Sequence, residues 1–265
     1  MPQEPMPQDT GPAVLAAVED GVATLTIRNP AKRNAMTPAM WRRVPELLED
    51  LAADPAVRVL VLTGGGGTFC AGADISALRG GEQESRGLAV AAEEALAAFP
   101  RPTLAAVRGH CVGGGCQLAV ACDLRFAAGD ALFGVTPAKL GIVYPASATR
   151  RLVSLTGPAT AKYLLFSGEL IGAERALRTG LVDEVHPGDG LGGRVAEFAR
   201  LLASRSQLTQ AAAKEFADGS ARGPADPERI AHWDRQARES GEAAEGVAAF
   251  LERRAPAFTW PLTGR

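Results

Sequence analysis

Three consecutive glycines, Gly113 to Gly115, stand between an apolar segment and a predicted buried helix. Residues 103–107 are apolar and are typical of a strand, and the residues from Gly115 onward have the composition of a buried helix. Glycine has no Cβ, so a ligand can approach the main chain here, and the first amides of a helix have no partner within it. Such amides can hold an anion or an oxygen that becomes negative during a reaction. A plain tight turn is the alternative interpretation.

A second glycine-rich loop of the same kind lies earlier in the chain. Residues 60–63 are typical of another buried strand, and Gly64 to Gly67 follow them. Two strand ends in one domain then present free main-chain amides, which is the arrangement that an oxyanion hole requires. Donors fixed around a carbonyl oxygen stabilise it more as charge builds, typically by a few kcal/mol per donor. A nucleotide-phosphate site is disfavoured, because no Gly-Lys-Ser/Thr follows the run.

Together the two motifs resemble those of the enoyl-CoA hydratase/isomerase (crotonase) family. They read Phe-Cys-Ala-Gly-Ala-Asp-Ile over residues 69–75 and Gly-His-Cys-Val-Gly-Gly-Gly-Cys-Gln over residues 109–117, and the likeness extends from about Val14 to Phe258. The resemblance implies an α/β fold, a spiral of ββα units followed by a helical C-terminal region that packs subunits into trimers or hexamers. It also implies that the amides of Ala73 and Gly114 polarise the carbonyl of an acyl-CoA thioester.

The same resemblance implies a binding surface for coenzyme A, which enters as part of the thioester substrate and not as a separate cofactor. The basic loop 28–36 contacts the CoA nucleotide in the family, and Lys32 and Arg33 suit its phosphates. A solvated connecting loop is the alternative. The other expected CoA contacts are Ala35, Ala71, Asp74 and Ile75, together with Phe250 and Arg253 in a C-terminal motif that reaches a neighbouring subunit. Plain helix surface is the alternative for Arg253.

Both positions that carry a catalytic glutamate in the family's hydratases hold other residues here. Aligned by motif, the first falls on Gln117 and the second on Pro137. A carboxamide cannot act as a base, and a proline side chain neither donates nor accepts a hydrogen bond. Ordinary hydration is therefore not expected. Isomerisation needs a base from elsewhere, such as the polar segment 76–99, which is predicted to form an interrupted helix over the acyl site.

The glutamates of that segment have a simpler interpretation as a solvated helix face. They are Glu82, Glu84, Glu93 and Glu94.

Residues 133–144 are similar to methylmalonyl-CoA decarboxylase, a family member with Thr-Pro and a tyrosine eight residues after the threonine. Loss of CO2 leaves an electron pair on the α-carbon, so the enzyme needs to stabilise an enolate and not to abstract a proton. On this hypothesis Thr136 and Tyr144 orient the departing carboxylate, and Gln117 hydrogen-bonds to the acyl group or a water. That relative has a histidine at the position of Ala73 and a glutamate at that of Gln117.

Three alternatives to a decarboxylase stay open. The chain is then an enoyl-CoA isomerase or hydratase with a non-standard base, or a non-catalytic acyl-CoA-binding subunit. Thr136 and Tyr144 would in those cases only pack the loop. His110, beside the glycine loop, is interpreted as a core residue in preference to an acid.

Composition sets the outer limits. The chain has 265 residues, with 28 basic and 30 acidic side chains and a net charge of -2, which argues against nucleic acid or an anionic membrane as the main partner. No apolar run approaches the roughly 20 residues of a membrane span. The four cysteines lack C-x-x-C spacing and predict free thiols in a reducing cytoplasm, and the scattered histidines predict no metal site.

The elements expected to position these residues follow from periodicity and turn signals. Residues 1–12 are predicted to be a disordered tail, 13–190 the crotonase-like core and 191–265 a helical region. Within the core, a hairpin is predicted over 14–27, strands over 57–63, 103–107 and 123–127, and a closing strand over 180–185. Helices are predicted over 38–53, 149–155, 158–166 and 173–178 and, after 191, over 208–216, 227–239 and 242–254.

Overall fold

Parallel strands bring both glycine loops to one edge of a sheet. The protein is seen in a computed structural model that describes residues 11–78, 82–220, 223 and 225–261. Within these residues the larger sheet has the order β1-β2-β3-β4-β6-β9. Its strands are β1 (Ala13–Glu19), β2 (Val22–Arg28), β3 (Val59–Gly64), β4 (Thr103–Val107), β6 (Leu124–Ala128) and β9 (Glu184–His186). The first two form the predicted antiparallel hairpin, and the others pair in parallel.

A smaller sheet stands beside the larger one and was not predicted. It contains β5 (His110–Val112) parallel to β7 (Leu132–Gly134), and β8 (Ile171–Gly172) antiparallel to β7. Twice the chain places a strand in the larger sheet, then one in the smaller sheet, then a helix: β4-β5-α3 and β6-β7-α4. This is the succession of ββα units that the family resemblance implies. The fold class was therefore predicted, although β5 itself was assigned to a turn.

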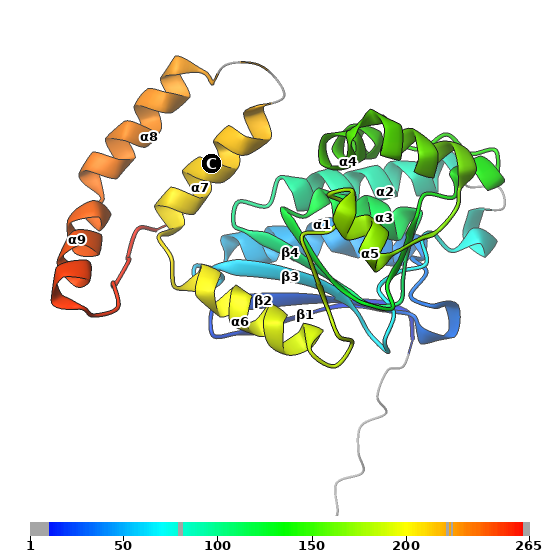
Figure 1. Cartoon of the computed structure of the whole chain (residues 1–265), viewed down its shortest axis with the longest axis horizontal. Coiled ribbons are helices and arrows are strands. Elements are labelled where there is room, and N and C mark those ends of the chain that lie inside the picture. The colour runs from blue at the N-terminus through cyan, green and yellow to red at the C-terminus, as the bar shows by residue number, and fades with distance from the viewer. Residues whose placement is uncertain (1–10, 79–81, 221–222, 224, 262–265) are drawn as a thin grey trace, which may run out of the picture.

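Helices cover both faces of the larger sheet (Figure 1). On one face lie α1 (Pro38–Ala53), α2 (Glu82–Ala97), α3 (Gly114–Ala121) and α4 (Ala146–Ser167), and on the other lies α6 (Leu191–Ala203). Strand β3 shows why both faces are apolar. Val59 and Val61 pack with α6, whereas Leu60 and Leu62 belong to the core under the other helices. Successive strand side chains point to opposite faces, so a strand buried on both faces is apolar throughout.

Local signals set several helix bounds as predicted. Helix α1 begins after Thr37, whose hydroxyl accepts a hydrogen bond from the Met40 amide at 3.3 Å, and Pro38 occupies the first turn. Helix α5 (Ala173–Arg178) has the predicted bounds. The two helices predicted over 149–166 are joined as α4, which is kinked at Gly157 (φ 71°, ψ 165°). The break predicted near Gly80 and Gly81 lies outside the described residues.

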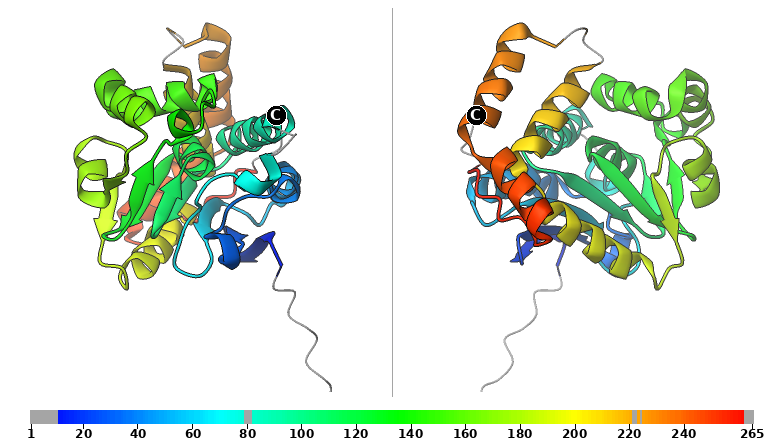
Figure 2. Two further views of the ribbon diagram at one scale, coloured as in Figure 1. Left: turned by 90° about the vertical axis from the view of Figure 1, so that its right-hand side faces the viewer. Right: turned by 60° about the vertical axis from the view of Figure 1, so that its left-hand side comes forward.

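The last helices project from the sheet as an arm (Figures 1 and 2). After α6 come α7 (Gln207–Gly219), α8 (Pro227–Glu239) and α9 (Glu242–Glu252), which have a small core of their own around Leu208, Ala211 and Trp233. Lys214 links α7 to the sheet through an ion pair with Asp123 at 2.8 Å. In the part of the chain that is described, no helix is both long and apolar enough to cross a bilayer.

Candidate active site

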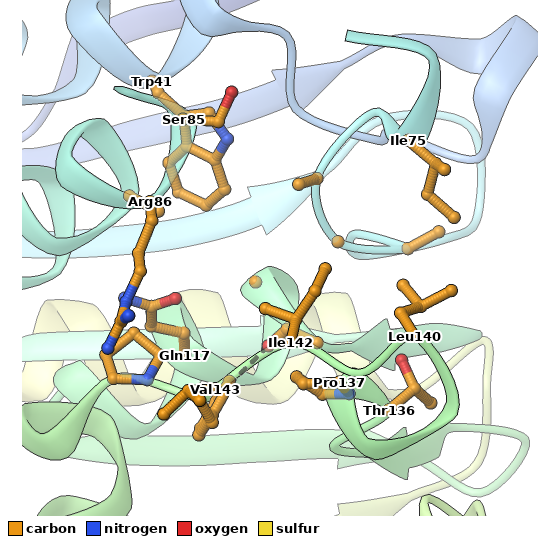
Figure 3. Close-up of a pocket in the computed structure, with 18 residues that line it drawn as sticks. Trp41, Ile75, Ser85, Arg86, Gln117, Thr136, Pro137, Leu140, Ile142 and Val143 are labelled. Atoms are coloured by element: carbon orange, nitrogen blue, oxygen red, sulfur yellow. Dashed lines mark hydrogen bonds between the residues drawn. The ribbon is translucent and has the colours of Figure 1, made fainter. Parts of the chain in front are cut away.

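A cleft opens where the two glycine loops meet helix α2 and the loop 136–145. Figure 3 shows Arg86 and Gln117 at one end of this cleft and Ile75 and Leu140 at the other. The lining contains segments that the sequence places far apart. These are Trp41, residues 71–73 and 75, Ser85, Arg86, Ala89, Gly113, Gly114, Gln117, residues 136–137, Leu140 and residues 142–145.

Two main-chain amides face each other across the loops. A Cβ built on Gly72 would lie 3.4 Å from the Gly114 nitrogen, and one built on Gly114 would lie 3.5 Å from the Ala73 nitrogen. Among the described residues, neither of the amides of Ala73 and Gly114 donates a hydrogen bond. Both residues line the cleft. The structure therefore brings together the two donors that the sequence selected, with their hydrogens available to a ligand oxygen.

Glycine is required where this strand turns into helix α3. Gly113 has φ +56° and ψ -114°, which L side chains rarely adopt. At Gly115 a Cβ would lie 2.3 Å from the Cys70 carbonyl oxygen, so any side chain would push the two loops apart. The bridge between Cys70 and Cys111 keeps the loops in register. The glycine run is thus part of the packing between loops as well as a local turn.

The predicted CoA loop is attached to the first glycine loop. Lys32 forms an ion pair with Asp74 at 2.7 Å, and the Ala71 amide donates to the Arg33 carbonyl at 3.0 Å. The hydrogen bond from Lys32, followed by that from Ser76, lowers the pKa of Asp74. Lys32 is half exposed, so it remains accessible at the mouth of the cleft.

Two of the other predicted CoA contacts have different surroundings. Ala35 is buried beneath the same loop, whereas Ile75 is exposed and lines the cleft.

The predicted C-terminal contacts lie elsewhere in the single chain. Phe250 is exposed on α9, and Arg253 follows it in a left-handed conformation (φ 53°). Neither lines the cleft, and Phe250 instead borders a groove between α7 and α9. Their neighbour Arg254 forms a bidentate ion pair with Glu245 at 2.6 and 2.8 Å. Contact of Phe250 or Arg253 with CoA remains a prediction that depends on a second subunit.

The polar side chains predicted for the acyl site do line the cleft. Gln117 projects from α3, and Thr136, Pro137 and Tyr144 come from the loop that follows β7. The Tyr144 hydroxyl donates to the Gly113 carbonyl oxygen at 3.2 Å. Burial, and then the neighbouring Cys116 and Glu93, raise the pKa of Tyr144, so the phenol keeps its proton near neutral pH.

The interpretation of Glu93 as solvated helix surface is wrong. Its side chain is 0% exposed, whereas that of the next residue, Glu94, is 51% exposed. Glu93 accepts hydrogen bonds from the Gln117 side-chain nitrogen at 2.8 Å and the Ser147 hydroxyl at 2.9 Å, and it pairs with the Arg151 guanidinium. It does not line the cleft but lies behind Gln117. A buried carboxylate normally requires partners of this kind.

Sequence reasoning missed Arg86 altogether. It lies on the second turn of α2, is exposed and lines the cleft. Within the described residues it makes no hydrogen bond or ion pair, and the cleft lining includes no carboxylate. The motifs contain no signal for this residue, because it comes from the polar segment whose placement over the site was predicted without assigning individual side chains. The cleft therefore has a net positive wall near Gln117.

The described residues contain no cluster of His, Cys, Asp or Glu that could hold a metal ion. All four cysteines are buried free thiols. Burial raises the pKa of Cys70 and of Cys122 to about 12, which leaves both as unreactive thiols. His110 is half-buried and does not line the cleft. The polar groups of the cleft are thus main-chain amides, hydroxyls, a carboxamide and a guanidinium.

Comparison with known proteins adds an independent line of support. A family model described as enoyl-CoA hydratase/isomerase matches residues 17–261. The 2,3-dehydroadipyl-CoA hydratase of Escherichia coli K12 is 33% identical over 92% of this chain and 98% of its own. A probable enoyl-CoA hydratase of Bacillus subtilis is 36% identical over 93% and 98%. The crystal structure of a putative enoyl-CoA hydratase/isomerase family protein from Hyphomonas neptunium superposes with a TM-score of 0.88, at 35% identity, covering 93% and 97% of the two chains.

Proposed function

Because the chain belongs to the enoyl-CoA hydratase/isomerase family, we propose that it binds an acyl-CoA thioester and stabilises its enolate with the amides of Ala73 and Gly114. The proposed reaction is loss of CO2 from a malonyl-type CoA ester. One observation carries this choice: the described wall of the cleft contains a guanidinium, that of Arg86, and no carboxylate. Such a cleft attracts an anionic acyl group and lacks a base to deprotonate a neutral one.

The proposed step needs no protein base. The bond between the α-carbon and the carboxylate breaks, its electron pair stays on the α-carbon and is delocalised onto the thioester oxygen, and CO2 leaves. Water then protonates the α-carbon to give the shortened acyl-CoA. The amides of Ala73 and Gly114 hold the oxygen as it gains charge, and each such donor contributes about 3 kcal/mol in comparable sites.

We assign separate roles to the two hydroxyls of the cleft. The Gly113 carbonyl accepts from the Tyr144 hydroxyl at 3.2 Å and from the Gln117 amide at 3.0 Å. That carbonyl and the Gly114 N–H belong to one planar peptide unit, so both hydrogen bonds fix the direction of the oxyanion donor. Thr136, whose hydroxyl makes no hydrogen bond within the described residues, is then the group that orients the carboxylate.

Hydration is the second candidate, because the curated relatives are named as hydratases and a buried carboxylate lies next to the cleft. For that reaction the Gln117 carboxamide would have to move aside so that Glu93 reached a water. Glu93 is held by Ser147 and Arg151 as well, which opposes such a movement. A third candidate is a subunit that binds acyl-CoA without turnover.

Product masses distinguish these candidates. The purified protein is incubated separately with methylmalonyl-CoA, crotonyl-CoA and a 3-enoyl-CoA, and the products are followed by mass spectrometry. Decarboxylation predicts that only methylmalonyl-CoA is consumed and that the product lacks the mass of CO2. Gain of water by crotonyl-CoA with no loss from methylmalonyl-CoA would reject the proposal in favour of hydration. Calorimetric binding of all three esters without a product would indicate a binding subunit.

A further inference from the structure

Glu93 and Gln117 form a contact whose polarity follows from their chemistry. An ionised carboxylate can only accept hydrogen bonds, and a carboxamide has one end that donates and one that accepts. The Gln117 side-chain nitrogen therefore faces Glu93, at 2.8 Å. The carbonyl oxygen of the same planar group is then directed away from Glu93. Gln117 itself lines the cleft, so this oxygen is the acceptor available to the acyl site.

The carboxylate is well anchored for such a role. Glu93 lies on α2, and its other partners, Ser147 and Arg151, both lie on α4. Arg151 also contacts the exposed Glu94 at 3.1 Å, so the guanidinium bridges two successive residues of α2. Its positive charge offsets the cost of burying Glu93. Two packed helices thus hold the oxygen of Glu93 against α3, which carries Gln117.

We propose that Glu93 is a positioning residue that holds Gln117 by its nitrogen, so that the Gln117 carbonyl oxygen orients the water that protonates the enolate carbon. That water donates one hydrogen to the Gln117 oxygen and directs the other at the α-carbon. The identity of the proton acceptor rests on the proposed function, whereas the contact and its polarity do not. The proposal therefore has two tests, of which the first requires no turnover.

The first test is a cycle of Gln117→Glu, Glu93→Gln and the double swap, with thermal unfolding midpoints measured from pH 4 to pH 8. In Gln117→Glu two carboxylates meet at hydrogen-bond distance and one has a raised pKa. Its folded state then binds more protons than the unfolded chain, so stability falls as pH rises above the unfolded value of about 4.3. We expect a loss of about 5 °C at pH 7. The double swap restores the contact with donor and acceptor exchanged, and it should restore the midpoint.

A Gln117→Glu variant as stable as the wild type at every pH, or a double swap that is no better than Gln117→Glu, would overturn the contact and with it the proposal.

The second test follows decarboxylation of methylmalonyl-CoA in D2O. The wild type should deliver deuterium to one face of the α-carbon. Glu93→Gln can both donate and accept, so the Gln117 carboxamide can turn over; we expect kcat to fall about tenfold, KM to change less than twofold and the deuterium to reach both faces. The control is Glu94→Gln, which also loses an Arg151 contact but does not touch Gln117, and it should match the wild type. Retained stereochemistry in Glu93→Gln would show that Glu93 has only a structural role.

Discussion

Charge in the cleft is concentrated on a few atoms at the residue scale. The Arg86 guanidinium lines the wall without a partner among the described residues, and Lys32 at the mouth is already paired with Asp74. An acyl carboxylate that enters the cleft therefore meets Arg86 as the available cation near Gln117. Hydrogen bonds to a charged group contribute about 1.5–3 kcal/mol, which is enough to select substrates.

Arg86→Gln is expected to raise the KM for methylmalonyl-CoA about tenfold, because the charge-assisted pair with the acyl carboxylate is lost. Binding of butyryl-CoA, which has no acyl carboxylate, should change less than twofold in calorimetry. Arg150→Gln on α4 removes the same charge outside the cleft and is the matched control. An equal loss of affinity for both esters would assign Arg86 to the CoA phosphates.

The two hydroxyl residues should give different kinetic defects. Tyr144→Phe removes a hydrogen bond to the Gly113 peptide, so we expect kcat to fall about tenfold as the Gly114 donor loses its fixed direction. Thr136→Val keeps the shape of the side chain but loses a donor to the carboxylate, and it should mainly raise KM. Steady-state kinetics with methylmalonyl-CoA measures both. If neither variant differs from the wild type, the two residues only pack the loop.

At the scale of the element, the closing strand is joined to helix α6 by charge. Glu184 on β9 accepts two hydrogen bonds from Arg194 on α6, each at 2.8 Å, and contacts His186 at 2.7 Å. The Arg194 hydrogen bonds, followed by that from His186, lower the pKa of Glu184 to about 2. The contact joins β9, at the edge of the larger sheet as described, to the helix on its second face.

This contact predicts part of the response of the protein to acid. A carboxylate with a lowered folded pKa stabilises the fold above its unfolded pKa of about 4.3, and the contribution is lost as pH falls toward about 2. Glu184→Gln should therefore lower the unfolding midpoint at pH 7 and reduce its fall between pH 4 and pH 2. Glu197→Gln removes a more exposed partner of Arg194 and serves as the control. Parallel curves for wild type and Glu184→Gln would contradict this prediction.

For the molecule as a whole, the arm presents an apolar face without a partner among the described residues. Val247, Phe250 and Leu251 on α9 are 61%, 82% and 74% exposed, a concentration of large apolar side chains that is typical of an interaction surface. We propose that this face packs against further copies of the chain, in a trimer or a hexamer.

Light scattering coupled to size exclusion is expected to show a mass of three or six subunits. Replacing both Phe250 and Leu251 by Asp should lower that mass, because the buried apolar area would be replaced by charge. Val18→Asp introduces the same charge on β1, away from α9, and should leave the mass unchanged. A wild type that runs as a monomer would refute the proposed assembly.

Much of this architecture was determined locally by the sequence. Helix α8 has the predicted bounds, because its cap and turn signals act within a few residues. The glycines around Gly72 and Gly113 identified the two loops correctly, since their positive φ values exclude most side chains. The family resemblance then selected Ala73 and Gly114, which the structure brings together.

Other features were decided only by tertiary structure. Strand β5 is three residues long and exists because β7 lies beside it, so no local pattern marks it. Glu93 and Glu94 are adjacent acidic residues of one helix, and one is buried because Ser147 and Arg151 of α4 pack against it. The partner in that ion pair lies 58 residues away in sequence. Burial and charge pairing depend on which distant segments meet, and periodicity within a segment contains no information about that meeting.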